Sequence, residues 1–412
     1  MDSVLRSHAD AIIKASITAV LPDEAVKRAL DGQNFPGRVL LVSAGKAAWQ
    51  MAKAAYDFWG DRIENGVVVT KYDHVMGPIG NFQCYEAGHP VPDENSFKGT
   101  QAALDLVSDL TENDTVLFLL SGGGSALFEK PVVSGEILQD ITGQLLACGA
   151  DIVEINTIRK RLSAVKGGRF ALACAPAKVF SIVLSDILGD PLDMIASGPA
   201  VPDTSTCEQA VAIAKKYDLK MPESAWALLE QETPKSLTNV TTQINGSVKE
   251  LCVAAAAACR ELGYEPIMLT DQLCCQAKEA GSFLASVLKT HAGGGKNLAF
   301  LAGGETVVQL TGSGKGGRNQ ELTLAAAVGI AGISGAAVFS VGSDGTDGPT
   351  DAAGGYTDYT TAGELKAQGI EIFDVLKQND AFHALQRVGG LVYTGPTGTN
   401  VNDVAVALLK VE

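Results

Sequence analysis

Two cationic side chains of this 412-residue chain occupy positions at which proteins bind phosphate or carboxylate groups. Lys46 follows the apolar run RVLLVSAG, and Arg318 follows the glycine-rich run GSGKGG, which also holds Lys315. We expect each position to lie just past a strand and at the start of a helix. A cation there opposes the helix dipole, so Lys46 is explained better by an anionic ligand than by helix stability, with a solvated lysine as the alternative. The paired cations Arg318 and Lys315 likewise favour an anion.

A glycine loop follows the apolar stretch TVLFLL, where Gly122, Gly123 and Gly124 stand between Ser121 and Ser125. Glycine weakens a strand, so three in succession mark a place where the backbone adopts a special conformation. One interpretation is a nest of successive N–H groups, flanked by the two serines, that binds a phosphate or carboxylate. The other is a tight strand–helix turn without a ligand, and the loop alone does not decide between them.

The densest basic run is NTIRKRLSAVKGGRF, which contains no acidic residue. Such a run is usually a solvated helix face. This one ends in two glycines and lies between two loop sites of a very acidic chain. We therefore expect Arg159 and Lys166 to face an anion.

Carboxylates cluster after two other apolar runs. Asp186 and Asp190 lie in LSDILGD, and Asp344 and Asp347 lie in SDGTDGPTD, which lacks the spacing and final Glu of a calcium loop. One or two carboxylates are sufficient for a Mg²⁺ ion that bridges phosphate oxygens, or for a base near a hydroxyl group. Asp186, Asp344 and Asp347 are the candidate metal ligands. His89 in GHPVPDENS adds either a polar contact or only a turn stiffened by prolines.

The elements that would position these residues are indicated by short apolar runs that alternate with longer helical stretches. Runs without polar alternation are typical of strands buried on both faces. They are RVLLVS, GVVVT, TVLFLLS, KVFSIVLS, NLAFLAG, TVVQLTG and AAVFSVGS. This pattern predicts an α/β protein with largely parallel, Rossmann-like sheets flanked by helices. Ligands of such sheets lie beyond the carboxyl ends of strands, where most of the residues above are expected.

The length of the chain predicts two domains. Near residues 230–245 the sequence turns polar and loses its periodicity, so we place the boundary there. The expected division is a larger N-terminal α/β domain over 1–237 and a C-terminal α/β domain over 238–412. The active site is expected in the cleft between them.

Composition excludes several classes of function. A formal net charge of −15 argues against nucleic-acid binding, which requires a basic face. We find no apolar run long enough to span a membrane, and the N-terminus reads as an amphipathic helix rather than a signal peptide. The eight cysteines form no C-x-x-C pair and are expected to be reduced thiols of a cytoplasmic protein.

Two kinds of chemistry remain open from the residues alone. Backbone cradles, cations at helix starts and paired aspartates together suggest phosphoryl transfer, in which positioning and charge stabilisation supply most of the catalysis. The second possibility is a nicotinamide site, because Gly312, Gly314 and Gly317 match G-x-G-x-x-G. However, the acid that should follow about 20 residues later, at the end of the next strand, is missing until Asp344.

The chain also resembles the bacterial glycerate 2-kinases, whose N-terminal α/β domain precedes a C-terminal domain known as MOFRL. The resemblance runs in order from about residue 5 to the C-terminus. The matching motifs are AGKAAWQMA, GHPVPDENS, LLSGGGSAL, EINTIRKRLSAVKGGR, LSDILGDPLDMIASGPAVPD, GGETVV, GKGGRNQEL, GSDGTDGPTDAAG and GPTGTNVND. Arg161 and Ala164 depart from the family pattern RKHLSRIKGG but leave its charged frame intact.

This resemblance implies ATP- and Mg²⁺-dependent phosphorylation of D-glycerate to 2-phosphoglycerate by a monomer or homodimer. It implies that Lys46, Arg318 and the acid of SD-x-x-GD are catalytic, and that acid is Asp190 or Asp186. Lys315 and Asn319 in GKGGRNQEL are expected to bind phosphate or substrate. The alternatives are an NAD(P)H-dependent hydroxypyruvate reductase, supported only by the partial glycine motif, and a sugar-acid sensor without turnover.

Overall fold

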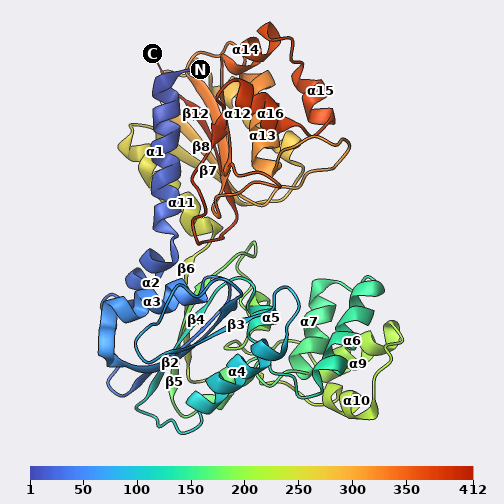
Figure 1. The fold of residues 1–412 in the computed structure, drawn as a ribbon. Helices are drawn as coiled ribbons and strands as arrows, with labels where there is room; N and C mark the ends of the chain where they lie inside the picture. Colours follow the sequence, from blue (N-terminus) through green and yellow to red (C-terminus); the bar gives the residue numbers. More distant parts are fainter. Residues whose placement is uncertain (412) are drawn as a thin grey trace. The chain divides into compact units, whose positions relative to one another are not determined.

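The computed structural model describes residues 1–411, which form two compact units (Figure 1). The first unit comprises Pro22–Asn245. The second unit comprises Met1–Leu21 together with the chain from Gly246 onward. Both are α/β units, as the sequence predicted. No helix within residues 1–411 has both the length and the apolar character needed to cross a membrane.

The first unit is built on a six-stranded sheet in the order β3-β2-β1-β4-β5-β6. Its strands are β1 (Val39–Ala44), β2 (Ile63–Lys71), β3 (Gln83–Ala87), β4 (Thr115–Leu120), β5 (Lys178–Leu184) and β6 (Val240–Gly246). The β1–β2, β2–β3, β1–β4 and β4–β5 pairs are parallel. This strand order is that of the Rossmann fold, so the predicted fold class is confirmed for this unit.

Helices cover this sheet because its central strands are apolar on both faces. Val42 and Phe118 enter the core on one face, while Leu41 and Leu117 enter the core on the other. The helices of the unit are α2 (Pro22–Leu30), α3 (Ala48–Trp59), α4 (Glu94–Leu106), α5 (Gly124–Leu127), α6 (Gly135–Ala147), α7 (Ile152–Arg161), α8 (Arg169–Ala173), α9 (Cys207–Lys216) and α10 (Glu223–Leu229), with short 3₁₀ turns η1 (Gly60–Arg62) and η2 (Ile195–Ser197). Helices α6, α7, α9 and α10 share a separate apolar cluster and lie together in Figure 1.

The second unit contains a six-stranded sheet in the order β11-β10-β9-β12-β8-β7. Its strands are β7 (Glu265–Leu273), β8 (Leu298–Gly304), β9 (Ala336–Gly342), β10 (Gly354–Asp358), β11 (Leu391–Val392) and β12 (Asp403–Leu409). Its helices are α1 (Ser3–Ala19), α11 (Val248–Glu261), α12 (Ala277–His291), α13 (Arg318–Ile330), α14 (Thr361–Ala367), α15 (Ile372–Lys377) and α16 (Ala381–Arg387).

This second sheet is mixed rather than largely parallel, which corrects the expectation for this unit. Strand β12 runs antiparallel to both β8 and β9, and β10 runs antiparallel to both β9 and β11. The β7–β8 pair is parallel. Strands β8, β9 and β12 are buried along their whole length. Full burial produced the continuous apolar runs, which therefore did not distinguish parallel from antiparallel pairing.

One predicted strand is absent. The run TVVQLTG, residues 306–312, lies in the irregular segment between β8 and α13. Val307 and Leu310 are exposed there, so these apolar side chains do not join the core. Conversely, six strands were not predicted, namely β3, β6, β7, β10, β11 and β12. Strands β6 and β7 are partly exposed and rich in polar residues, whereas β12 was missed although it is apolar and fully buried.

The division between the units differs from the expected domains of 1–237 and 238–412. The polar stretch ends in β6, which adds to the edge of the first sheet, so the chain leaves the first unit after Asn245. Helix α1 is grouped with the second unit although it comes first in the sequence. Leu5, Ile12 and Ile13 are buried on its inner face, and the helix packs against α11.

Candidate phosphate-binding site

Strands β1 and β4 are neighbours at the point where the strand order of the first sheet changes direction, which is where open α/β sheets bind ligands. The last residues of the two strands pair in register, so the loops that follow them begin side by side. The Lys46 N–H donates to the Gly122 carbonyl at 2.9 Å, and the Ala47 N–H donates to Ser121 Oγ at 3.1 Å. The lysine after β1 and the glycine loop after β4 therefore belong to one site.

The glycine loop carries successive backbone donors. Within residues 1–411, no backbone carbonyl accepts a hydrogen bond from the N–H groups of Gly122, Gly123, Gly124 or Ser125. Gly123 has a φ of 84°, a left-handed conformation that favours glycine. The Ser121 side chain is buried and supports the neighbouring loop through Ala47. This arrangement favours the anion-binding nest over a turn without a ligand.

Three candidate side chains converge on the glycine loop from three different loops. A methyl group added at Gly122 would overlap Oδ2 of Asp186, which follows β5. A methyl group added at Gly123 would lie 3.1 Å from Nε2 of His89, which follows β3, and 3.2 Å from Cγ of Lys46. Sequence reasoning left His89 undecided, because its only signal was the motif GHPVPDENS.

The positive charge of Lys46 affects the pKa of His89. Partial burial, followed by the positive charges of Lys46 and Lys71, lowers the pKa of the His89 imidazole below its usual value of 6.5. We expect Lys46→Met to raise the His89 pKa toward that value, because one of the repelling charges is removed. The measurement is an NMR titration of the histidine ring protons. Lys53→Met is the matched control, since Lys53 pairs with Asp57 on the surface. An unchanged His89 pKa in Lys46→Met would contradict the placement of the two residues.

Asp190, the other candidate acid after β5, is distinguished by its environment. Its φ is 51°, which is unusual for a residue with a side chain. Its Oδ1 atom is buried and has no hydrogen-bond partner within residues 1–411. Buried carboxylate oxygens normally have a partner, so this atom is suited to a ligand or cation.

Arg159 and Lys166 lie behind the glycine loop. Each donates to the Ser125 carbonyl at 2.9 Å, and each lies near Glu129, at 3.6 Å and 3.5 Å. Lys166 also donates to the Phe128 carbonyl at 3.1 Å, and burial lowers its pKa to about 8. The Lys166 ammonium group is fully buried by protein, which does not fit the expected direct contact with an anion. Lys166 instead supports the loop, and the direct anion contact expected for Arg159 stays a prediction.

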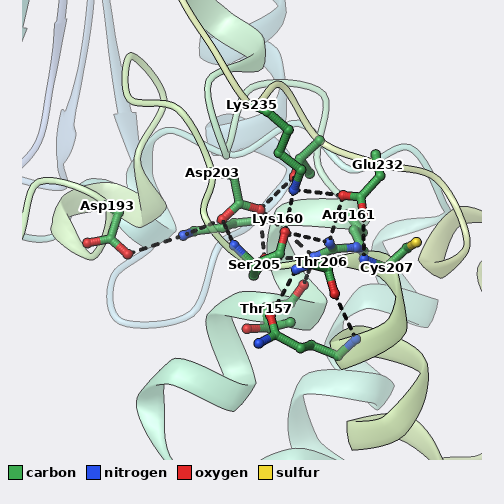
Figure 2. Close-up of polar contacts among 12 residues, drawn as sticks. Thr157, Lys160, Arg161, Asp193, Asp203, Ser205, Thr206, Cys207, Glu232 and Lys235 are labelled. Carbon is green, nitrogen blue, oxygen red and sulfur yellow. Dashed lines mark hydrogen bonds and ion pairs between the residues drawn. The ribbon is translucent and has the colours of Figure 1, made fainter.

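The middle of the basic run forms a buried ionic network rather than a solvated helix face (Figure 2). The Lys160 ammonium group contacts Asp203 Oδ1 at 3.1 Å and Asp193 at 3.7 Å. Arg161 is completely buried, and its guanidinium group donates to the side chain and the carbonyl of Ser205. The network joins α7 to the segments around Asp203 and Glu232. Sequence reasoning missed it because a run of like charges gives no sign of its distant carboxylate partners.

Arg318 lies at the start of α13 in the second unit, as expected, but it does not lie just past a strand, because residues 305–317 are irregular. Its Nε and Nη2 atoms donate to the two oxygens of Asp403 at 2.5 Å and 3.0 Å. Its Nη1 atom contacts Glu305 at 3.0 Å, and Asn402 donates to the other oxygen of Glu305 at 3.1 Å. Asp403 is buried whereas Glu305 is exposed, so the guanidinium group is held from one side and is partly open to solvent.

Asp347, predicted as a metal ligand, caps α13 instead. Its oxygens accept the N–H groups of Asn319 and Gln320 at 3.1 Å and 2.9 Å, and burial raises its pKa to about 7. The Asn319 side chain is buried, where it bonds Asp347 and Ser340. These contacts occupy both residues and give no support to a metal-binding or substrate-binding role.

Two other predicted residues of the second unit remain accessible. The Lys315 ammonium group lies 4.5 Å from the centroid of the Phe382 ring. Asp344 is partly exposed, and its Oδ1 accepts the Thr346 N–H at 3.0 Å. Within residues 1–411, Cys207, Glu208 and Glu232 form the one trio spaced to share a metal ion, and it contains none of the predicted ligands.

The G-x-G-x-x-G motif is explained by packing of the protein on itself. A methyl group at Gly312 would overlap the backbone of Gln378, and one at Gly317 would overlap Asp347. The motif also does not follow a strand directly, because residues 305–317 are irregular. A dinucleotide fingerprint requires a strand before the glycines and their close approach to a ligand. Neither condition is met here.

A Rossmann-ordered sheet with a glycine nest and a lysine at its switch point is typical of α/β proteins that bind phosphate groups. Comparison with known proteins agrees with this class. Residues 8–230 match a family described as a domain of unknown function, DUF4147, and residues 298–403 match the MOFRL family.

The chain is 54% identical over 411 residues to a protein of Thermotoga maritima named D-glycerate 2-kinase, with 98% of each chain covered. A crystal structure titled glycerate kinase, also from Thermotoga maritima, superposes with a TM-score of 0.95 at 52% identity and covers 99% of this chain and 100% of that one. A putative hydroxypyruvate reductase of Agrobacterium vitis is 38% identical, with 97% of this chain and 93% of that protein covered. The chain belongs to the glycerate 2-kinase family, as its motifs indicated.

Proposed function

We propose that this protein transfers the terminal phosphoryl group of ATP to D-glycerate and produces 2-phospho-D-glycerate and ADP. The observation that carries the proposal is the convergence of Lys46, His89 and Asp186 on the glycine nest at the β1/β4 switch point. The 54% identical relative named D-glycerate 2-kinase supports the choice of substrate. The partners are therefore small molecules, and whether the protein is a monomer or a homodimer stays a prediction.

In this reaction the 2-hydroxyl oxygen of glycerate forms a bond to the γ-phosphorus, and the bond from that phosphorus to the bridging oxygen of ADP breaks. The hydroxyl proton passes to the carboxylate of Asp186 or Asp190. The N–H groups of Gly122–Ser125 bind phosphate oxygens, and the Lys46 ammonium group stabilises the charge that spreads over them. We assign charge stabilisation to Arg318 as well, because Asp403 fixes the orientation of its guanidinium fork.

A magnesium ion fits the carboxylates of the first unit. The Oδ1 atom of Asp190 is buried without a hydrogen-bond donor, and hard cations prefer such oxygens. Asp186 or Asp190 would hold the ion. Bound Mg²⁺ would neutralise phosphate charge, as in other phosphoryl transfers.

The test is a coupled assay of the full-length protein with ATP, Mg²⁺ and D-glycerate, run beside an assay with NADPH and hydroxypyruvate. We expect ADP formation that requires glycerate, a 2-phosphoglycerate product identified by NMR, and loss of activity when EDTA removes Mg²⁺. Oxidation of NADPH by hydroxypyruvate without ADP formation would overturn the proposal in favour of the reductase. The packing of Gly312 and Gly317 against protein counts against that second function.

A further inference from the structure

A strained turn lies directly behind the glycine loop. Ala196, Ser197 and Gly198 have φ values of 51°, 61° and 65°, so three successive residues are in the left-handed region. That region is unfavourable for residues with a Cβ atom, and here two such residues are adjacent. Both are buried, Ala196 at 5% exposure and Ser197 at 0%. Strain of this kind persists only where the surroundings impose it, and it is concentrated at functional sites.

The side chains of this turn make contacts that glycine would lack. The Ala196 Cβ lies 2.7 Å from the point where a Cβ on Gly124 would stand, so it packs closely on the loop. The Ser197 hydroxyl lies 3.3 Å from the hydroxyl of Ser125 and donates to Asn156 Oδ1 at 2.9 Å. Glycine would adopt the same backbone without strain, as Gly198 does. The contacts of the Ala196 methyl group and the Ser197 hydroxyl group therefore explain why these positions hold strained residues and not glycine.

The turn is also fixed from its other side. The Gly167 N–H donates to the Ser197 carbonyl at 3.0 Å, and the Gly168 N–H donates to the Gly198 carbonyl at 2.7 Å. Lys166 reaches the Ala196 carbonyl at 3.5 Å and the Ser125 carbonyl at 2.9 Å, so it links the turn to the loop. These bonds make the turn a rigid backing for the loop.

We propose that Ala196 and Ser197 are positioning residues that hold the backbone of Gly122–Ser125 in its phosphate-binding conformation. The Ala196 methyl group limits how far Gly124 can retreat, and the Ser197 hydroxyl group fixes Ser125. The kinetic part of this inference rests on the proposed function, whereas its structural part does not. The proposal predicts that a substitution which relieves the strain of this turn does not lower stability but does reduce activity.

The test is Ala196→Gly, with Asp218→Gly as the matched control. Asp218 also has a positive φ, 48°, but it lies exposed between α9 and α10, away from the loop. Both changes relieve strain, so neither should lower the melting temperature. Only Ala196→Gly should reduce kcat, by about ten- to a hundredfold, because small displacements of catalytic groups are costly. If Ala196 had only a structural role, its replacement by glycine would instead lower stability and leave kcat of the folded enzyme unchanged.

Hydrogen exchange gives a second readout that does not depend on activity. The Leu127 and Phe128 N–H groups donate to the carbonyls of Gly123 and Gly124 at 3.2 Å and 2.9 Å. Their exchange should be faster in Ala196→Gly than in the native protein and unchanged in Asp218→Gly. Ser197→Ala, which removes the contact with Ser125, should also make these N–H groups exchange faster, but to a smaller extent.

Unchanged exchange together with unchanged kcat in Ala196→Gly would overturn the inference. If the native protein has no kinase activity, the proposed function fails, and the exchange measurement alone then decides whether the turn positions the loop.

Discussion

Replacing Lys46 by alanine should lower kcat by about two to three powers of ten, which corresponds to about 3–4 kcal/mol of transition-state stabilisation. The side chain lies against Gly123 and beside His89, where it would meet the phosphoryl group bound by the nest. The Lys46 backbone N–H, and not its side chain, makes the hydrogen bond to the Gly122 carbonyl that joins the two loops. The melting temperature should therefore stay near the native value. Near-normal kcat in Lys46→Ala would remove this residue from the mechanism.

Arg318→Ala should lower kcat to a similar extent, but with a cost in stability. Removing the guanidinium group leaves the buried Asp403 carboxylate without its bidentate partner, and an unpaired buried charge is destabilising. Arg318→Lys should not restore the full rate, because an ammonium group cannot reproduce the planar fork. Glu305→Gln is the control, since it alters the exposed partner and keeps both Arg318 and Asp403. A variant of Arg318 that is destabilised but turns over normally would show a structural role only.

Asp203→Ala should lower the free energy of unfolding by about 3–5 kcal/mol, as expected when one partner of a buried ion pair is removed. Lys160 would lose its 3.1 Å contact in a place where its side chain is only 4% exposed. Ser205 would lose the carboxylate oxygen to which it donates at 2.8 Å (Figure 2). Thr233 would lose the same oxygen, to which it donates at 2.7 Å. Chemical denaturation followed by circular dichroism is the measurement.

The same carboxylate gives a pH dependence with a defined sign. Burial alone would raise the pKa of Asp203, but the Thr233 hydroxyl, the Lys160 charge and Ser205 together lower it. A lowered folded-state pKa contributes stability that is present above the unfolded value of about 3.9 and is lost as pH falls through the folded value. Asp203→Ala should lack this acid-sensitive contribution. Asp218→Asn, on the surface beside Lys220, should change stability by less than about 0.5 kcal/mol and serves as the control. An equally small loss in the free energy of unfolding of Asp203→Ala would contradict a stabilising role for the buried ionic network around Asp203.

The first sheet was largely predictable because its central strands are buried on both faces and read as continuous apolar runs. The run TVVQLTG also contains β-branched and apolar residues, yet Leu310 is 80% exposed, so composition did not reveal that the segment stays outside the sheet. Strand β6 was read as a linker, because an edge strand with a partly exposed surface tolerates polar residues. The mixed pairing of the second sheet was not predictable, since burial and not strand direction determines the apolar pattern.

For the candidate site, sequence reasoning identified the loops better than the roles of individual residues. Lys46, the glycine loop and Asp186 were predicted from their places after strands, and the structure brings them together. Lys166 was predicted as an anion contact from charge alone, whereas its partner Glu129 is remote in sequence and buried. The left-handed conformation of Ala196 could not be predicted from the sequence, because alanine rarely adopts it.

The place of α1 has a consequence for how the protein is made. Helix α1 is translated before the first unit, whereas α11 and the second sheet, which cover its apolar face, are translated only after the whole first unit. At about 5–20 residues per second, Ile12 and Ile13 would wait about ten to fifty seconds for α11. During that interval the helix offers a hydrophobic surface to chaperones. A chain shortened to begin at Gly246 would never receive the helix, and it would expose the complementary face of α11 permanently.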